Sequence, residues 1–231
     1  MRAADDALLF KTMIRGMARK HGLYATFLAK PYPEHSGSGA HVHFSVLDQD
    51  GNNIFDDGGP EGTDALRAAI AGCVEGLKEL SLLLTPHGVS FDRLVEGAYA
   101  PTGLCWGYEN RSVALRIPGG SPKARRIEHR VAGADVCPYL MLTGILGAAL
   151  EGMDQNMTPP PPISGSAFDA DLPMIPSNWD AAISAFESSS LARQIFDPVL
   201  HDAIVRTKRQ EQRITENLDQ TQKILMYLER V

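Results

Sequence analysis

Cysteine is scarce in this sequence, and long hydrophobic runs are absent. The three cysteines, Cys73, Cys105 and Cys137, lie far apart and form no C-x-x-C pair, which argues against a disulfide framework or a zinc site and favours reduced thiols. The longest uncharged apolar stretch, residues 136–150, is too short and too interrupted by glycine to span a membrane. The first residues offer no apolar signal core. We therefore expect a soluble, cytoplasmic protein.

Positive charge is also in short supply. The 231 residues include 22 Lys and Arg against 28 Asp and Glu, a net charge of −6, which argues against a general nucleic-acid binder because phosphate contacts need a basic surface. A hydrophobic content of 44% with 22% charged residues excludes disorder, collagen-like repeats and a disulfide-stapled miniprotein. The chain can bury a core in one large domain, or in one domain with an appendage.

Apolar residues recur at helical spacing in several segments. The predicted helices cover residues 7–21, 63–85, 135–152, 179–187, 190–196, 198–218 and a last piece ending at residue 231. Four consecutive prolines and the polar segment after them mark residues 158–178 as a linker or crossover. The pattern thus divides the chain into residues 1–157, the crossover at 158–178, and a helical tail at 179–231.

Period-two alternation and turn residues indicate where the strands lie. The predicted strands cover residues 24–29, 41–47, 53–55, 113–117 and 126–131, with 53–55 returning from a hairpin turn at Asp50 and Gly51. The Gly- and Pro-rich segment that ends at Glu109 is predicted to be a long ordered loop. Strands alternating with helices favour an α+β or α/β domain with a C-terminal helical tail.

Cations are concentrated in one short segment of this acidic chain. Residues 111–130 contain one acid, Glu128, and six cations: Arg111, Arg116, Lys123, Arg125, Arg126 and Arg130. In a strand, Arg126, Glu128 and Arg130 share one face, and burying them requires phosphate, carboxylate or metal partners. An isolated R-x-E-x-R pattern more often forms a solvated, salt-bridged face. The neighbouring cations favour an anion site, and the lack of interleaved aromatic residues favours ATP over RNA or DNA.

Two histidines form a second candidate feature. His41 and His43 share one face of the predicted strand at 41–47, behind the Gly37-Ser38-Gly39 loop. One imidazole could ligate a metal and the other could contact phosphate, although structural histidines are as common. The glycine loop could be a simple turn or could hold a carboxylate on its backbone N–H groups. It is not a P-loop, because the GK[ST] ending is absent.

Taken together, these segments resemble a known family. Thr26 to Pro31, Gly37 to His43, Asn110 to Pro118, Pro122 to Arg130 and Pro138 to Leu140 follow the order and spacing of the glutamine synthetase catalytic domain. The resemblance covers roughly residues 5–230. It implies an α+β fold with an antiparallel sheet, flanking helices and a C-terminal helical tail. Residues 1–157 are then part of such a catalytic domain, and the tail belongs to the same domain.

The resemblance implies a reaction and a set of site residues. In that family two divalent cations, usually Mg²⁺ or Mn²⁺, hold ATP while the γ-carboxylate of glutamate attacks its terminal phosphate. Ammonia or an amine then captures the γ-glutamyl phosphate. Position by position, the implied metal ligands are His41 and Glu128; the ATP contacts are His43, Ser45, Arg111, Arg116, Lys123 and Arg126; and the glutamate contacts are Gly37, Arg93 and Arg130. Arg111 and Arg130 are the implied catalytic residues, with Arg111 neutralising charge on the transferring phosphoryl group.

The sequence departs from the family pattern in several places. The family's N-terminal β-grasp domain and the early strands with most metal-binding glutamates are not matched, so we expect these 231 residues alone to have little or no activity. Tyr99 stands where the family's flap has a glutamate that accepts the ammonium proton, with Glu96 at a different flap position. Tyr99 therefore predicts a larger amine as acceptor, as in γ-glutamylpolyamine ligases. Ser36 replaces an asparagine beside the glutamate loop, and Cys137 replaces another.

Two other classes of function stay open. A scaffold or pseudoenzyme that keeps the fold for assembly is the main alternative, although His41, Arg111, Glu128 and Arg130 together favour an active enzyme. An RNA-binding basic sheet is disfavoured by the net charge. The resemblance also implies a homo-oligomer, because family members stack as double rings with active sites between neighbouring subunits.

Overall fold

A four-stranded sheet carries most of the residues singled out in the sequence. The computed structural model describes residues 1–95, 100–228 and 230–231. The strands are β1 (Val42–Phe44), β2 (Trp106–Tyr108), β3 (Leu115–Ile117) and β4 (Ile127–His129), in the spatial order β1-β4-β3-β2. Both β1 and β3 pair antiparallel with β4, as expected, whereas β2 pairs parallel with β3. The sheet is therefore mixed. Because β2 and β3 run in the same direction, the chain between them returns to the end of the sheet at which β2 begins.

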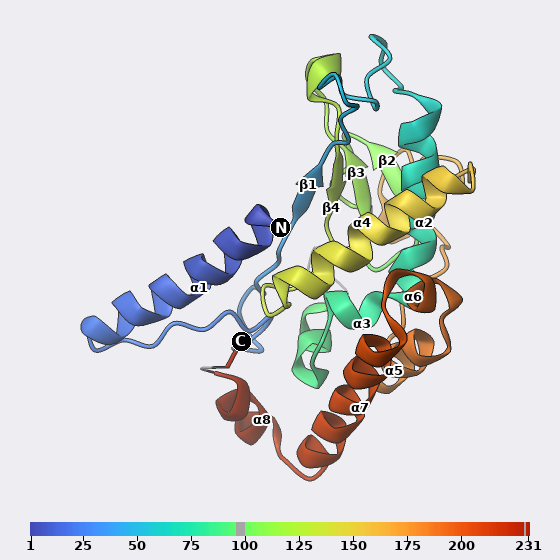
Figure 1. Ribbon diagram of the computed structural model, residues 1–231. Helices are drawn as coiled ribbons and strands as arrows, with labels where there is room; N and C mark the ends of the chain where they lie inside the picture. The colour runs from blue at the N-terminus through green and yellow to red at the C-terminus, as the bar shows by residue number, and fades with distance from the viewer. Residues whose placement is uncertain (96–99, 229) are drawn as a thin grey trace.

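Helices surround this sheet (Figure 1). They are α1 (Arg2–Lys20), α2 (Asp64–Glu79), α3 (Ser81–Leu84), α4 (Pro138–Asp154), α5 (Trp179–Ser188), α6 (Ser190–Ile195), α7 (Pro198–Thr215) and α8 (Gln220–Tyr227), with the short 3-10 helices η1 (Gly88–Arg93), η2 (Pro122–Ala124) and η3 (Ala167–Asp169). Every predicted helix is present. Within the described residues, none of the helices combines the length and apolar character that a membrane crossing requires.

The pair α2 and α4 packs behind the sheet and forms the main core. Apolar side chains of α2 and α4, such as Ile70 and Ile145, join Leu115 and Ile127 of the sheet in one buried cluster. The two helices approach closely at glycines: a Cβ on Gly72 would lie 2.0 Å from the carbonyl oxygen of Ala148. This core buries one face of the sheet and leaves the other for polar residues.

The C-terminal helices pack on the rest of the chain. In Figure 1, α5, α6 and α7 gather below α4, and α8 lies apart from them. Their apolar side chains, including Trp179 and Phe186, form a second buried cluster with Leu82 and Leu83 of α3. Asn178, Ser189 and Asp197 cap α5, α6 and α7 by accepting hydrogen bonds from backbone N–H groups. The tail thus has its own core, joined to the sheet layer through α3.

Three strand predictions differ from the structure. Residues 24–29 form no strand; instead Leu28 is buried in a cluster with Val89 and Tyr227. Residues 53–55 contribute only one isolated bridge, between Asn53 and Leu47. Conversely, β2 lies inside the segment predicted to be a loop. These differences share one cause. Whether a segment pairs as a strand depends on a partner distant in sequence, which alternation does not reveal.

Helix α1 is present, but its apolar stripe is not buried. Leu9, Met13 and Met17, which predict the helix by their spacing, are each more than half exposed. The helix is attached instead by polar contacts: Lys11 donates hydrogen bonds to the carbonyl oxygens of Ala134 and Val136 at 2.5 and 3.0 Å. Phe10 meets the ring of Phe27 edge to face, and Ala4 is buried. Helical periodicity thus predicts this helix correctly even though most of its apolar stripe is exposed.

Candidate active site

The carboxylate of Glu128 lies at the centre of a polar network on one face of the sheet. Its side chain is 4% exposed. It accepts hydrogen bonds from Nη1 of Arg116 at 2.7 Å and from Nη1 of Arg130 at 2.5 Å. Nδ1 of His41 lies 3.2 Å from Oε1 of Glu128, and Nε2 of His43 lies 3.8 Å from the same oxygen. We call these five residues the Glu128 network.

Strand register brings the Glu128 network together. His43 of β1 is paired with Glu128 of β4, and Arg116 of β3 is paired with the same residue from the other side. Because alternate residues of a strand share a face, His41 and Arg130 join that face two residues away. The predicted alternation along residues 41–47 and 126–131 therefore matches the structure. His129, on the opposite face, is buried against the helical core.

The electrostatics of the Glu128 network favour an ionised carboxylate beside a neutral imidazole. Burial raises the pKa of Glu128, but the hydrogen bonds and charges of Arg116 and Arg130 outweigh it, so the net shift is downward. The pKa of His41 is lowered by burial and by the charge of Arg130, against the opposing effect of Glu128. At neutral pH His41 therefore has a lone pair available for a ligand.

Glu109 joins this network through Arg116, and the sequence reasoning missed it. Nη2 of Arg116 donates to Oε1 of Glu109 at 2.9 Å, and the backbone N–H of Gly119 donates to the same oxygen. Glu109 has a φ of +50°, an uncommon conformation for a residue other than glycine. Nothing in the local sequence marks Glu109 as a partner of Arg116, because it follows a short strand that alternation did not predict.

His43 and Ser45 have partners next to the network. Nε of Arg126 donates to Nδ1 of His43 at 3.1 Å, so the ring proton of a neutral His43 belongs on Nε2, which faces Glu128. The hydroxyl of Ser45 donates to the carbonyl oxygen of Arg125 at 2.8 Å. Arg125 itself is buried and donates to the carbonyl oxygens of Gly59 and Pro60. Arg125 therefore binds the loop at residues 59–60 to the segment before β4. It is a structural cation, although it is among the cations of residues 111–130.

Gly37 and Arg93, both expected to contact glutamate, lie against each other. A Cβ on Gly37 would lie 2.7 Å from Cγ of Arg93 and 2.8 Å from the carbonyl oxygen of Ala29, so only glycine fits there. Arg93 is 5% exposed, and its Nη2 donates to the carbonyl oxygens of Val131 and Ala132 at 2.6 and 2.7 Å. The backbone after β4 thus orients this guanidinium.

Besides Gly37, Ser45, Arg93 and Arg126, two more predicted residues lie outside the Glu128 network. Lys123 on η2 and Arg111 after β2 have exposed side chains, and in the described part of the chain neither side chain contacts Glu128. The backbone oxygen of Arg111 accepts a hydrogen bond from Nη2 of Arg130 at 3.2 Å, which places Arg111 at the edge of the network. Glu96 and Tyr99 of the flap lie outside the described residues.

The donor set around Glu128 fits part of a metal site. Oε1 of Glu128 and Nδ1 of His41, 3.2 Å apart, are close to the separation of about 3 Å that neighbouring ligands have around an octahedral Mg²⁺. Across residues 1–95, 100–228 and 230–231, no group of three or more His, Cys, Asp or Glu side chains is arranged to hold a metal ion. His41 and Glu128 thus offer two donor atoms, and a metal ion held there would need further ligands from other groups.

A cavity lies beside the two described ends of the flap. It has a volume of about 560 Å³ and is lined mainly by apolar side chains, among them Leu94, Ala100 and Phe168. Ser112, next to Arg111, forms part of its wall. The cavity therefore provides an apolar space close to the edge of the Glu128 network.

Comparisons with known proteins agree on one group of enzymes. The sequence model of the family described as "Glutamine synthetase, catalytic domain" matches residues 1–227. The chain is 38% identical over 202 residues to gamma-glutamylputrescine synthetase PuuA of Escherichia coli, covering 87% of this chain and 43% of that protein. It is 38% identical over 192 residues to a gamma-glutamylethanolamide synthetase of Streptomyces coelicolor, covering 83% and 41%.

Solved structures give the same result for the fold. The structure described as "Apo GmaS without ligand" superimposes with a TM-score of 0.84 at 28% sequence identity, covering 94% of this chain and 51% of that chain. A second structure, described as a GmaS complex with ADP, gives the same score. The chain spans about half the length of the curated relatives it matches.

Proposed function

The chain belongs to the glutamine synthetase catalytic-domain family, and from this premise we propose that it is part of an ATP-dependent ligase that joins glutamate to an amine. The observation that carries the proposal is the Glu128 network, in which a buried carboxylate, two arginines and two histidines meet on one sheet face. Relatives named for γ-glutamyl amide synthesis support it, and the complex of a GmaS structure with ADP supports a nucleotide in the reaction.

In the proposed reaction, the γ-carboxylate oxygen of glutamate attacks the terminal phosphorus of ATP, and ADP leaves. The amine nitrogen then attacks the γ-carbonyl carbon of the γ-glutamyl phosphate, inorganic phosphate leaves, and the nitrogen loses a proton. Arg111 and Arg130 balance negative charge as it moves. Arg93 and Arg130 orient glutamate above Gly37. His41 and Glu128 would hold a divalent cation, Mg²⁺ or Mn²⁺, which would neutralise phosphate charge.

The proposed ATP contacts are His43, Ser45, Arg111, Arg116, Lys123 and Arg126. Arg116 already donates to Glu109 and Glu128 through its two Nη atoms. Its contact with Glu109 is the exposed one, since the Glu109 side chain is 61% exposed. We therefore expect phosphate to replace Glu109 on Nη2 while Glu128 keeps Nη1 in place.

The acceptor in this proposal is an amine larger than ammonia. The relatives are named for putrescine, ethanolamide and isopropylamine products or substrates, and Tyr99 replaces the flap glutamate on which the use of ammonia depends. The apolar cavity beside the flap suits the carbon chain of such an amine. Other relatives, at 31% identity, are named glutamine synthetases. Ammonia is therefore the competing acceptor that the experiment must test.

The experiment that tests the function combines binding with turnover. Titration calorimetry with ATP and Mg²⁺ should detect binding that is lost in Arg116→Ala. Phosphate release should then be compared with putrescine, ethanolamine and ammonia as acceptors, in a version of the enzyme that includes the remaining site segments. A clear preference for ammonia contradicts the amine proposal, and absence of ATP binding contradicts the ligase proposal and leaves the scaffold alternative.

We further propose that the 231 residues alone turn over slowly or not at all. The described residues supply two metal ligands in the Glu128 network, whereas a two-metal clamp on ATP needs several more. Residues 1–157, the crossover at 158–178 and the tail at 179–231 then form one portion of a catalytic unit completed by other chain segments, in the homo-oligomeric double ring typical of the family. Sedimentation velocity tests the assembly, and turnover equal to that of a complete relative contradicts the incompleteness.

A further inference from the structure

The C-terminal helices pack against the two segments that hold Gly37 and Arg93. Tyr227 of α8 is 3% exposed and packs in a small buried cluster with Leu28 and Val89. Leu28 precedes the loop of Gly37, and Val89 lies on η1, the same short helix that ends with Arg93. One cluster therefore joins α8 to both proposed glutamate-binding segments.

A buried carboxylate on α7 fixes this arrangement. Glu211 accepts hydrogen bonds from the hydroxyl of Tyr227 at 2.6 Å and from Nζ of Lys208 at 2.8 Å, and it lies 2.5 Å from Nδ1 of His87. The side chains of His87 and Glu211 are 12% and 16% exposed. Because His87 is the residue that precedes η1, this carboxylate connects η1, α7 and α8 at one point.

The protonation states at neutral pH suit these bonds. Burial raises the pKa of Glu211, but His87 and Lys208 outweigh burial and bring it to about 2. Burial and the hydrogen bond to Glu211 raise the pKa of Tyr227. An ionised carboxylate thus accepts from a neutral phenol, and hydrogen bonds to an ionised group are stronger than those between neutral groups.

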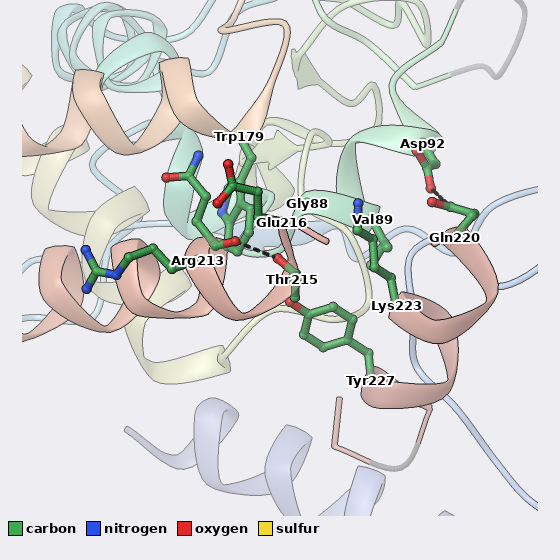
Figure 2. Close-up of a pocket in the computed structure, with 11 residues that line it drawn as sticks. Gly88, Val89, Asp92, Trp179, Arg213, Thr215, Glu216, Gln220, Lys223 and Tyr227 are labelled. Carbon is green, nitrogen blue, oxygen red and sulfur yellow. Dashed lines mark hydrogen bonds between the residues drawn. The ribbon is translucent and has the colours of Figure 1, made fainter. Parts of the chain in front are cut away.

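Other contacts between η1 and the tail are mostly apolar: Phe91 of η1 packs against the second buried cluster, and a Cβ on Gly88 would lie 3.1 Å from Cε3 of Trp179. Figure 2 shows a cavity between η1, α7 and α8, with Val89, Thr215 and Tyr227 among its walls, and its volume is about 610 Å³. Across it, Nε2 of Gln220 donates to Asp92 at 2.5 Å. The hydroxyl of Ser90 on η1 also donates to Asp135 at 2.6 Å. The bonds to Glu211 and the cluster of Tyr227 therefore share in determining where η1 lies on the side of the cavity.

The position of η1 is transmitted directly to the site. Arg93 is bonded to the backbone of Val131 and Ala132, just beyond β4, and its Cγ limits the space at Gly37. A shift of η1 therefore moves the Arg93 guanidinium relative to both the Glu128 network and the glycine loop. A guanidinium that binds a carboxylate through two N–H groups is sensitive to such a shift.

We propose that Glu211, His87 and Tyr227 are positioning residues, which hold η1 and thereby Arg93 in place for binding the carboxylate of glutamate. The proposal rests on the proposed function, because it assigns Arg93 to glutamate. It gives the C-terminal tail a part in substrate binding, although none of its residues reaches the Glu128 network in the described part of the chain.

The test uses two conservative variants of the full chain and one matched control. Tyr227→Phe removes a single hydroxyl group and keeps the ring, and Glu211→Gln removes the charge and keeps the shape. Glu187→Gln removes a similar ion pair, because Glu187 on α5 lies 3.0 Å from Arg209 on α7, but it leaves η1 untouched. The measurements are backbone amide exchange in residues 88–95 by mass spectrometry and, in the enzyme completed by its remaining site segments, the KM for L-glutamate and kcat at saturating ATP.

We expect amide exchange in residues 88–95 to rise about threefold to tenfold in both variants but not in the control, which is the size expected for one lost hydrogen bond. KM for L-glutamate should rise by a similar factor while kcat changes less than about twofold. Unchanged exchange, or a loss of kcat at constant KM, overturns the proposal. If the enzyme completed by its remaining site segments neither binds nor uses L-glutamate, the proposed function fails, and amide exchange in residues 88–95 still decides whether Glu211 holds η1.

Discussion

At the scale of single residues, the buried carboxylate of Glu128 needs charged hydrogen-bond donors around it. Removing a carboxylate from water is unfavourable unless charged donors replace the water. Arg116 and Arg130 supply those donors, and both are themselves largely buried. The three side chains therefore depend on one another, and the loss of one leaves buried charge without a partner.

Replacing Glu128 should reveal that dependence. Glu128→Ala should lower the free energy of unfolding by about 3–5 kcal/mol, because it leaves two buried guanidinium groups without their partner. Glu109→Ala is the matched control: it removes the other carboxylate bound to Arg116, but Glu109 is 61% exposed, so we expect a much smaller loss than for Glu128→Ala. Urea unfolding measures both. Equal losses in the two variants contradict the central place of Glu128.

Gly37 gives a second prediction for a single residue. Gly37→Ala introduces a Cβ that would lie 2.7 Å from Cγ of Arg93 and 2.8 Å from a backbone oxygen, so it should destabilise the protein by about 1–3 kcal/mol and weaken L-glutamate binding. Gly16→Ala, with no atom within 4 Å of the new Cβ in α1, should instead stabilise it by about 0.5–1 kcal/mol. Thermal unfolding and calorimetry check both. A neutral Gly37→Ala contradicts the close approach of Arg93.

At the scale of elements, the crossing of α2 and α4 determines how closely helices can approach behind the sheet. Gly72→Ala would place a Cβ 2.0 Å from the carbonyl oxygen of Ala148 and 2.8 Å from Cα of Gly152. Neither backbone can move without separating the helices, so we expect a loss of about 3 kcal/mol. Gly144→Ala, on α4, is the comparison: the new Cβ would lie 2.8 Å from the end of the flexible Leu83 side chain. A loss of about 1 kcal/mol is expected there, and urea unfolding distinguishes the two.

At the scale of the whole molecule, the tail is joined to the rest of the chain partly through charge. The pKa of Glu211 is about 2, below its ordinary value of 4.5. A group with a depressed pKa stabilises the fold above its ordinary pKa, and this stabilisation disappears as the pH falls from about 4.5 to 2. Glu211→Gln should therefore reduce the free energy of unfolding at pH 7 by about 1–3 kcal/mol, with the difference from the unsubstituted chain shrinking below pH 4.5.

Chemical unfolding at several pH values between 2.5 and 7 measures this difference. Glu187→Gln again serves as the control, since its exposed ion pair with Arg209 should contribute little at any pH. A difference for Glu211→Gln that does not depend on pH contradicts an ionised, buried Glu211.

The sequence by itself determined the local geometry of this protein. Helical spacing predicted the α-helices, with α2 and α3 as one helix over residues 63–85, but not the 3-10 helices. Side-chain periodicity is a property of neighbouring residues, so it predicted even α1, whose Leu9, Met13 and Met17 remain exposed. Alternation likewise placed His41 and His43 on one face of their strand. It placed Arg126, Glu128 and Arg130 on one face of a second strand.

Only the tertiary structure decided which faces meet and what surrounds them. The pairing of His43 with Glu128, the bond from Arg116 to Glu109 and the contact of Tyr227 with η1 each join residues that different segments contribute. Register and packing follow from the total burial and hydrogen bonding of the whole chain, so no local pattern contains them. For the same reason residues 24–29, which are predicted to be a strand, form none, and Leu28 packs instead against Tyr227 and Val89.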